Sequence, residues 1–319
     1  MGMSSINTNI SAMTALQSLQ QTSRDLLTTQ NRISTGLKVG SASDNAAYWS
    51  IATTMRSDND ALSTVQDALG LGKGTVDVAY NALNQSVTLV SQIKQKLTAA
   101  AAPGVDRSKI QSEITQLQEQ LKGIAETANF SGQNWVSVDS SATGYSGTKT
   151  IVASFARTAD GSVSIGTISV DTSTSVLFDS SAATGAAGGI LDSQRNSTGA
   201  IDTSGTGGTS VMDIDISDLS DSSTDQETLN GYISSVDAAF QEMTTAATNL
   251  GAAQKRIELQ TSFISSLRDT ITTGVSQLVD AQMNEESTRL SALQVKQQLG
   301  VQALSIANQS SQNILSLFR

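Results

Sequence analysis

The sequence contains no cysteine and no histidine, only one proline, and only 4% aromatic residues. Without cysteine no disulfide can form, so the redox state of the compartment cannot be inferred from the chain. The missing thiol and imidazole groups exclude the usual zinc sites, histidine-based triads and cysteine nucleophiles. We therefore expect a protein that is not an enzyme and that holds no metal and no cofactor.

Charged residues are also scarce, at 15%, and acidic ones predominate, which gives a net charge of −10. This balance argues against binding to nucleic acid or to an anionic membrane surface. No apolar run reaches the roughly 18 residues that a membrane-spanning helix needs. The first residues also lack the basic and apolar regions of a secretory signal peptide. We expect a chain that is either cytoplasmic or exported by a route that reads another signal.

The strongest pattern that is present is a heptad repeat, which occurs twice. The first series begins after Tyr48 and consists of Met55, Leu62, Leu69, Val76, Leu83, Val90 and Leu97. The second consists of Leu229, Val236, Met243, Leu250, Ile257, Ile264, Ile271 and Leu278. Unbroken heptads of this length predict two long helices that pack along each other.

The only proline, Pro103, precedes a glycine and should end the first long helix. Ser108 and Gln111 then have the spacing of a capping box, which predicts the start of a second helix. Because the connection is short, this helix should run antiparallel to the first.

Both ends of the chain carry weaker apolar stripes on a background of Ser, Thr, Gln and Asn. They consist of Leu19, Leu26 and Ile33 near the start and of Leu290, Leu293, Val301, Leu304, Ile314 and Leu315 near the end. Leu293, Leu304 and Leu315 are eleven apart, a period that favours a nearly straight or slightly right-handed coil. Helices with such narrow apolar faces are marginal alone and should fold only when the stripe is covered.

The centre of the chain, about 138–224, has a different composition. It holds ten Asp and no Glu against one Lys and two Arg, a net charge of −7. Residues 150–170 predict a β-hairpin with its turn at Asp160-Gly161, and residues 211–217 alternate like an edge strand. The predicted fold class is thus mainly α, a long antiparallel coiled-coil bundle with a small, solvated β-rich insertion.

The stretch from Asn31 to Ala47 can be interpreted as a ligand site, a hinge or a joint. Gly36 and Gly40 lie in it between the weak terminal stripe and the strong heptads, and Tyr48 and Trp49 follow directly. We favour an extended connector between two helical parts, with the aromatic pair buried against a neighbouring helix or subunit. Other candidate sites are weaker, since Gly70–Gly74 lacks the spacing of a phosphate loop and the Asp residues from 213 to 221 lack that of a calcium loop.

Four stretches resemble core motifs of bacterial flagellin, the filament subunit of the flagellum. They are "INTNISAMTALQSLQ", "NRISTGLKVGSASDNAA", "SEITQLQEQLKGIAETANFSGQ" and "QQLGVQALSIANQSSQNILSLFR". The segment "SASDNAAYWSIATTMRSD" is most similar to alphaproteobacterial, rhizobial-type flagellins. The resemblance implies an inner coiled coil from residues 1–44 and 276–319, a helical outer core from 45–137 and 225–275, and a variable surface domain from 138–224.

The resemblance also implies a life cycle and partners. The subunit would be exported unfolded by the flagellar type III system, without a cleavable signal peptide, and would polymerise outside the cell at the filament tip. Its partners would be copies of itself, other flagellins, the filament cap, hook–filament junction proteins and an export chaperone. A hook–filament junction protein and a secreted coiled-coil binding module are the alternatives. An embedded zinc protease would need histidine.

Flagellin receptors of plants and animals read two regions of the family. In the plant region Leu37, Gly40, Tyr48 and Trp49 are among the departures from the family pattern. In the animal region the expected positions carry Leu89, Ser91 and Gln92, while Glu113 still fits. The resemblance therefore implies weak or absent recognition.

Overall fold

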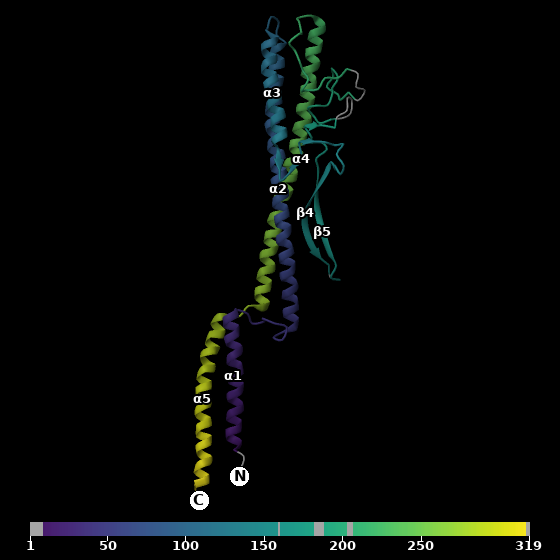
Figure 1. Cartoon of the computed structure of the whole chain (residues 1–319). Coiled ribbons are helices and arrows are strands. Elements are labelled where there is room, and N and C mark those ends of the chain that lie inside the picture. The colour runs from purple at the N-terminus through teal and green to yellow at the C-terminus, as the bar shows by residue number, and fades with distance from the viewer. Residues whose placement is uncertain (1–8, 159, 182–187, 203–206, 317–319) are drawn as a thin grey trace. The chain divides into compact units, whose positions relative to one another are not determined.

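The computed structural model describes residues 9–158, 160–181, 188–202 and 207–316, and the surroundings of side chains as far as residue 309. It is mainly helical, with a small strand-containing region in the middle of the chain, which confirms the predicted fold class. Its helices are α1 (Ile10–Thr35), α2 (Ala46–Ala100), α3 (Arg107–Thr127), α4 (Ser223–Val279) and α5 (Met283–Ser316) (Figure 1).

The chain divides into two compact units. The first unit consists of residues 1–60 and 268–319, and holds α1, α5, the start of α2 and the end of α4. The second unit, 61–267, holds the remainder of α2 and α4 together with α3 and the strands. The five-part division predicted from the sequence stays a prediction.

The heptad residues form the core of the second unit. On α2 the six from Leu62 to Leu97 are at most 3% exposed, and on α4 the six from Leu229 to Ile264 are at most 1% exposed. Polar side chains beside this core also join the two helices. Lys94 forms an ion pair with Asp237, and the Gln254 amide donates a hydrogen bond of 2.7 Å to Asp77. The repeat of 3.5 residues thus places one buried stripe on each long helix.

The turn after α2 begins as Pro103 predicts, but the expected capping box is wrong. The Asp106 side chain is the N-cap of α3 and accepts a hydrogen bond of 3.4 Å from the Lys109 N–H. Ser108 therefore lies inside the helix, and the Gln111 side chain bonds to a distant segment instead of the helix start. Asp106 satisfies a free N–H group in the first turn of α3, which is the role that the sequence assigned to Ser108 two residues later.

The predicted hairpin is present as β4 (Thr148–Arg157) paired antiparallel with β5 (Val163–Asp171), with an irregularity between Val152 and Ser154. Gly161 has a φ of 86°, a left-handed conformation that suits glycine in a turn. Four shorter strands form two further pairs. These are β1 (Asn129–Phe130) antiparallel to β2 (Gln133–Asn134), and β3 (Ser137–Val138) parallel to β6 (Phe178–Asp179).

Two glycines of α2 allow these strands to approach the helix closely. A Cβ atom on Gly72 would lie 2.6 Å from the Cγ2 of Ile151, and one on Gly74 would lie 2.7 Å from the ring of Phe130. The glycines weaken the helix by about 1 kcal/mol each, but a larger residue would displace β4 or β1. The Gly-rich stretch is therefore a packing surface of α2.

The central insertion is only partly solvated, and the edge strand predicted at residues 211–217 is wrong. No strand forms there, although Val211, Ile214 and Ile216 are at most 1% exposed. Leu177 and Leu191 are also fully buried. The alternating apolar and polar residues that suggested a strand belong instead to an irregular segment, whose apolar side chains lie against α3.

Candidate functional site

The two ends of the chain form an antiparallel helix pair, α1 and α5 (Figure 1). At one end of the pair the Asn9 amide donates a hydrogen bond of 3.0 Å to the carbonyl oxygen of Ala307. At the other end the Arg32 Nη1 atom lies 3.1 Å from the Glu286 Oε1 atom. These contacts fix which residues of the two helices face each other.

The facing sides of both helices repeat every 3.5 residues. In α5 every residue from 283 to 309 that is not exposed belongs to one series with alternating steps of four and three. This series is Glu286, Leu290, Leu293, Gln297, Gly300, Leu304 and Ala307. The matching series in α1 is Ala15, Leu19, Thr22, Leu26, Thr29 and Ile33. We call these two series the seam.

The seam differs in two ways from the apolar stripes predicted for the two ends of the chain. The eleven-residue period is not its repeat, because Leu293 and Leu304 are joined by steps of four, three and four. Val301 lies off the seam and is 53% exposed. Leu293 is buried at 8% exposure, whereas Leu19, Leu26, Ile33, Leu290 and Leu304 are half-buried. The side chains of Ile314 and Leu315 lie outside the described residues.

The seam is too polar to hold the pair together strongly. Thr22 and Thr29 occupy two of its most buried positions, at 2% exposure each. At Gly300 the missing side chain lets Leu19 approach, since a Cβ there would lie 3.2 Å from the Leu19 Cδ1 atom. An exposed pair of helices with so few buried apolar side chains gains little free energy from its own packing.

Both helices carry further apolar side chains that do not face each other. In α5 Val295, Leu299 and Ile306 are 55%, 59% and 68% exposed and lie within about 40° of one another on the helix. In α1 Ile10, Met13, Leu16 and Leu27 are 45% to 65% exposed. We call these seven residues the outward stripes. Sequence reasoning missed them, although the steps of four and seven in α5 are a helical signal.

The connector between α1 and α2 is shorter than predicted. Residues 31–35 belong to α1, which ends at Gly36 in the left-handed conformation, with φ of 73°. The connector then pairs with the junction between α4 and α5. The N–H groups of Lys38 and Val39 donate to the Val279 carbonyl at 2.7 and 3.2 Å, and the Ala281 N–H donates to the Gly36 carbonyl at 2.8 Å.

Both polar and apolar side chains hold the connector in place. Asp44 accepts hydrogen bonds from the Ser41 side chain and from the Ser41 and Gly40 N–H groups, and these bonds lower the pKa of its carboxyl. Val39 is buried with Ala52, Val275 and Val279, and the half-buried members of this cluster are Leu37, Met55, Ile271 and Leu278. The connector is therefore held within the first unit by hydrogen bonds and by a buried apolar cluster.

The aromatic pair that follows the connector is exposed. Tyr48 and Trp49 are 44% and 39% exposed, and Ile51 beside them is 50% exposed. The predicted burial against a helix of the same chain is therefore wrong. Burial against another subunit stays a prediction, and the patch adds to the apolar surface of the first unit.

Comparison with known proteins gives the family of this chain. Residues 6–140 match the description "Bacterial flagellin N-terminal helical region" and residues 233–318 match "Bacterial flagellin C-terminal helical region". The chain is 49% identical to Flagellin C of Rhizobium meliloti (strain 1021), over 99% of this chain and 100% of that protein. The chain belongs to the bacterial flagellin family. Over the same shares of both chains it is 43% identical to Flagellin A of Rhizobium meliloti and 44% identical to a flagellin of Brucella melitensis biotype 1.

The function of the chain follows from its membership of the flagellin family. Flagellins are structural proteins that polymerise into the flagellar filament outside the cell, and this chain is a filament subunit. Nothing in these matches favours a hook–filament junction protein or a secreted binding module. Within the described residues, no helix of this flagellin is both long enough and apolar enough to cross a bilayer.

Four residues that bear on the expected recognition by animal flagellin receptors lie in the second unit, namely Leu89, Ser91, Gln92 and Glu113. Leu89 is only 7% exposed, so its side chain packs inside the unit. Ser91 is half-buried and Gln92 is exposed. Glu113 forms an ion pair with Lys96, which joins α3 to α2. Leu89 therefore offers no charge at the surface of the second unit.

Proposed function

We propose that neighbouring subunits of the filament pack against one another through the outward stripes of α1 and α5. The observation that carries this proposal is the exposure of seven large apolar side chains on two helices whose shared seam is partly polar. Burial of such side chains is worth about 1.5–3 kcal/mol each. Contacts with neighbouring subunits can therefore supply the free energy that the isolated pair lacks.

The proposal extends to export and to the layout of the filament. Weak α1–α5 packing suits a subunit that the flagellar type III system exports unfolded and without a cleavable signal peptide. Ordering of the two helices would then follow assembly at the filament tip, under the cap protein.

The layout of the filament follows the division of the chain. The inner coil would consist of residues 1–44 and 276–319, and the outer rods of residues 45–137 and 225–275. The surface towards the medium would consist of residues 138–224. Junction proteins, an export chaperone and other flagellins are the further partners that we propose.

Replacement of Leu299 by Asp tests the outward stripes. A carboxylate in a subunit interface would have to be desolvated, so we expect pelletable filaments to fall at least about ten-fold. The variant chain should still reach the medium as monomer, because the change leaves the seam intact. Sedimentation of culture medium and electron microscopy of the pellet measure both quantities.

Gln294→Asp is the matched control for this experiment, since Gln294 is exposed but lies on neither the seam nor an outward stripe. It should leave the filament yield unchanged. In cells without the flagellar export apparatus neither chain should appear in the medium. Normal filaments from Leu299→Asp would remove the outward stripe of α5 from the assembly interface.

We also propose that flagellin receptors of plants and animals recognise this subunit weakly. The buried Leu89 and the neutral Gln92 support this for the animal receptor, and the departures at Leu37, Gly40, Tyr48 and Trp49 support it for the plant receptor. A reporter-cell assay with purified monomer should give little response. A response as strong as that of an activating flagellin would contradict the proposal.

A further inference from the structure

Three apolar side chains of an irregular segment in the second unit are buried as deeply as the helical core. Residues 210–221, which we call the strap, form neither helix nor strand. Val211, Ile214 and Ile216 of the strap are 0%, 1% and 0% exposed. Irregular backbone that is buried needs partners for its N–H and carbonyl groups, because unpaired groups are costly.

Two glutamines of α3 supply those partners. The Gln118 amide donates to the carbonyl oxygens of Val211 and Ile214, at 3.0 and 3.3 Å. The Gln111 amide nitrogen donates to the Ile214 carbonyl at 3.1 Å, and its oxygen accepts from the Ile216 N–H at 3.1 Å. The side-chain amides thus take the place that a neighbouring strand would have.

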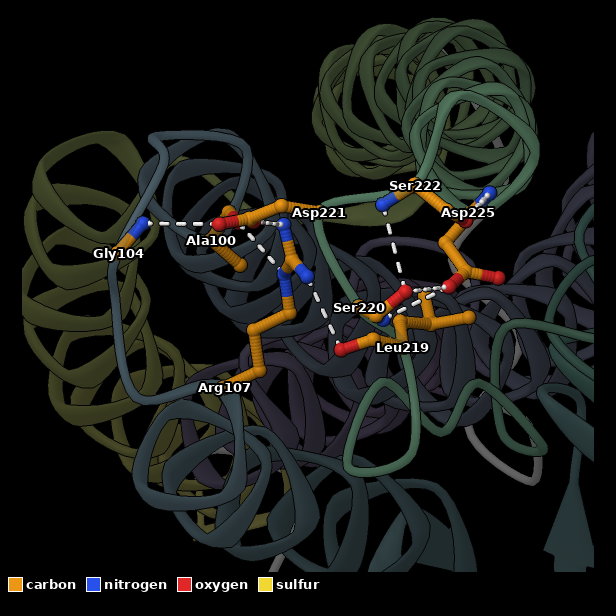
Figure 2. Close-up of polar contacts among 8 residues, drawn as sticks. All are labelled: Ala100, Gly104, Arg107, Leu219, Ser220, Asp221, Ser222 and Asp225. Carbon is orange, nitrogen blue, oxygen red and sulfur yellow. Dashed lines mark hydrogen bonds and ion pairs between the residues drawn. The ribbon is translucent and has the colours of Figure 1, made fainter.

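Arg107 binds the end of the strap (Figure 2). Its Nη1 atom donates to the Leu219 carbonyl at 3.0 Å, and its Nη2 atom lies 2.7 Å from the Asp221 Oδ1 atom. Its Nε atom donates to the Ala100 carbonyl at 3.1 Å, at the end of α2. The guanidinium group is therefore shared by the strap and by the turn between α2 and α3, and its side chain is only 6% exposed.

Arg107, Gln111 and Gln118 lie on one face of α3, since steps of four and seven residues keep them within about 40° on the helix. Asp221 strengthens the connection, because its Oδ2 atom accepts a hydrogen bond of 3.2 Å from the Gly104 N–H in the α2–α3 turn. We propose that this face of α3 is a docking site for a peptide segment with spaced apolar side chains, which residues 210–221 occupy in the folded subunit. The three side chains recognise peptide groups, and the buried valine and isoleucines supply the apolar contact.

The site can be tested in the full chain by hydrogen exchange. In the double variant Gln111→Ala, Gln118→Ala, the Ile216 N–H loses its acceptor and the strap loses its backbone partners. We expect the strap amides to exchange at least about ten-fold faster, while amides of the β4–β5 hairpin keep their rates. The double variant Gln116→Ala, Gln120→Ala is the matched control, because both residues are exposed and lie on the same helix. An unchanged rate in the strap, or an equal rise in the control, would overturn the proposal.

A second measurement tests the docking site with added peptide. In a full chain with Val211, Ile214 and Ile216 replaced by Ser, the site should lose its own ligand. A labelled peptide of residues 208–222 should then bind this variant, as measured by fluorescence anisotropy, and should bind the unchanged chain at least about ten-fold more weakly. Equal binding to both chains, or no binding to a variant whose circular dichroism is unchanged, would contradict the proposal.

Discussion

Truncation of the chain after Ala303 should abolish filaments and leave the second unit folded. The cut removes Leu304 and Ala307 from the seam, and with Ala307 the carbonyl oxygen that Asn9 binds at 3.0 Å. The start of α1 then has no helix opposite it. Because a short exposed helix is marginal in water, α1 should lose its first turns and the assembly surface with them.

A single substitution should have the same effect with less disturbance. Leu304→Asp places a carboxylate at a half-buried seam position, where it would have to be desolvated or protonated. Ser305→Asp is the matched control, since Ser305 is exposed beside it. Electron microscopy of purified protein should show filaments for the control alone. Circular dichroism on heating should show the same main transition for all chains, because the second unit is unaltered. Normal filaments from the truncated chain would refute the prediction that the seam is required for filament assembly.

Glu242→Ala should destabilise the second unit more than Arg195→Met, although the two residues form one ion pair. The Arg195 side chain is 1% exposed and that of Glu242 is 43% exposed. Two nitrogens of Arg195 bind both Glu242 oxygens, and they also donate to the Gly199 and Ile190 carbonyls at 3.2 Å each. The arginine thus joins the central insertion to α4.

The two substitutions differ in their expected loss of stability because each leaves a different charged group without its partner. Without Glu242 the guanidinium stays buried and unpaired, which costs about 3–5 kcal/mol. Without Arg195 the carboxylate can turn to water, so we expect about 2 kcal/mol, chiefly from the carbonyls that lose a donor. Urea unfolding followed by circular dichroism measures both values. Arg256→Met, at an exposed position of α4, should change the free energy of unfolding by less than about 0.5 kcal/mol. A larger loss from Arg195→Met than from Glu242→Ala would show that packing of the arginine stem outweighs its charge.

The strap and the Arg195 contacts determine which deletions in the centre of the chain disturb the helices. A solvated insertion between residues 138 and 224 could be removed with little effect on the helices. In the structure Ile214 and Ile216 are buried against α3, and Leu191 is fully buried near Arg195. The β4–β5 hairpin is more exposed, since Val163 and Ile165 are 50% and 64% exposed. The hairpin is therefore the part of the insertion whose replacement disturbs the core least.

The regular elements with a strong local pattern, and the family, could be predicted from the sequence. Heptads such as those from Leu62 to Leu97 specify a buried stripe through their period alone, and Pro103 and Asp160-Gly161 act through local backbone geometry. The terminal motifs identified the flagellin family, which the comparisons confirm. These inferences succeeded because each depends on neighbours that are close along the chain.

Contacts between side chains that are far apart along the chain could not be predicted in this way, because they depend on how the helices pack. The pairing of α1 with α5 made Thr22 and Thr29 part of the seam and left Val301 exposed. The residues that bind the strap, Gln111 and Gln118, look like ordinary surface glutamines in the sequence. Their partners lie about a hundred residues away, at separations of 93 to 105. A side-chain amide bonds any peptide group that the fold brings within 3 Å or so, and local sequence does not encode which one arrives.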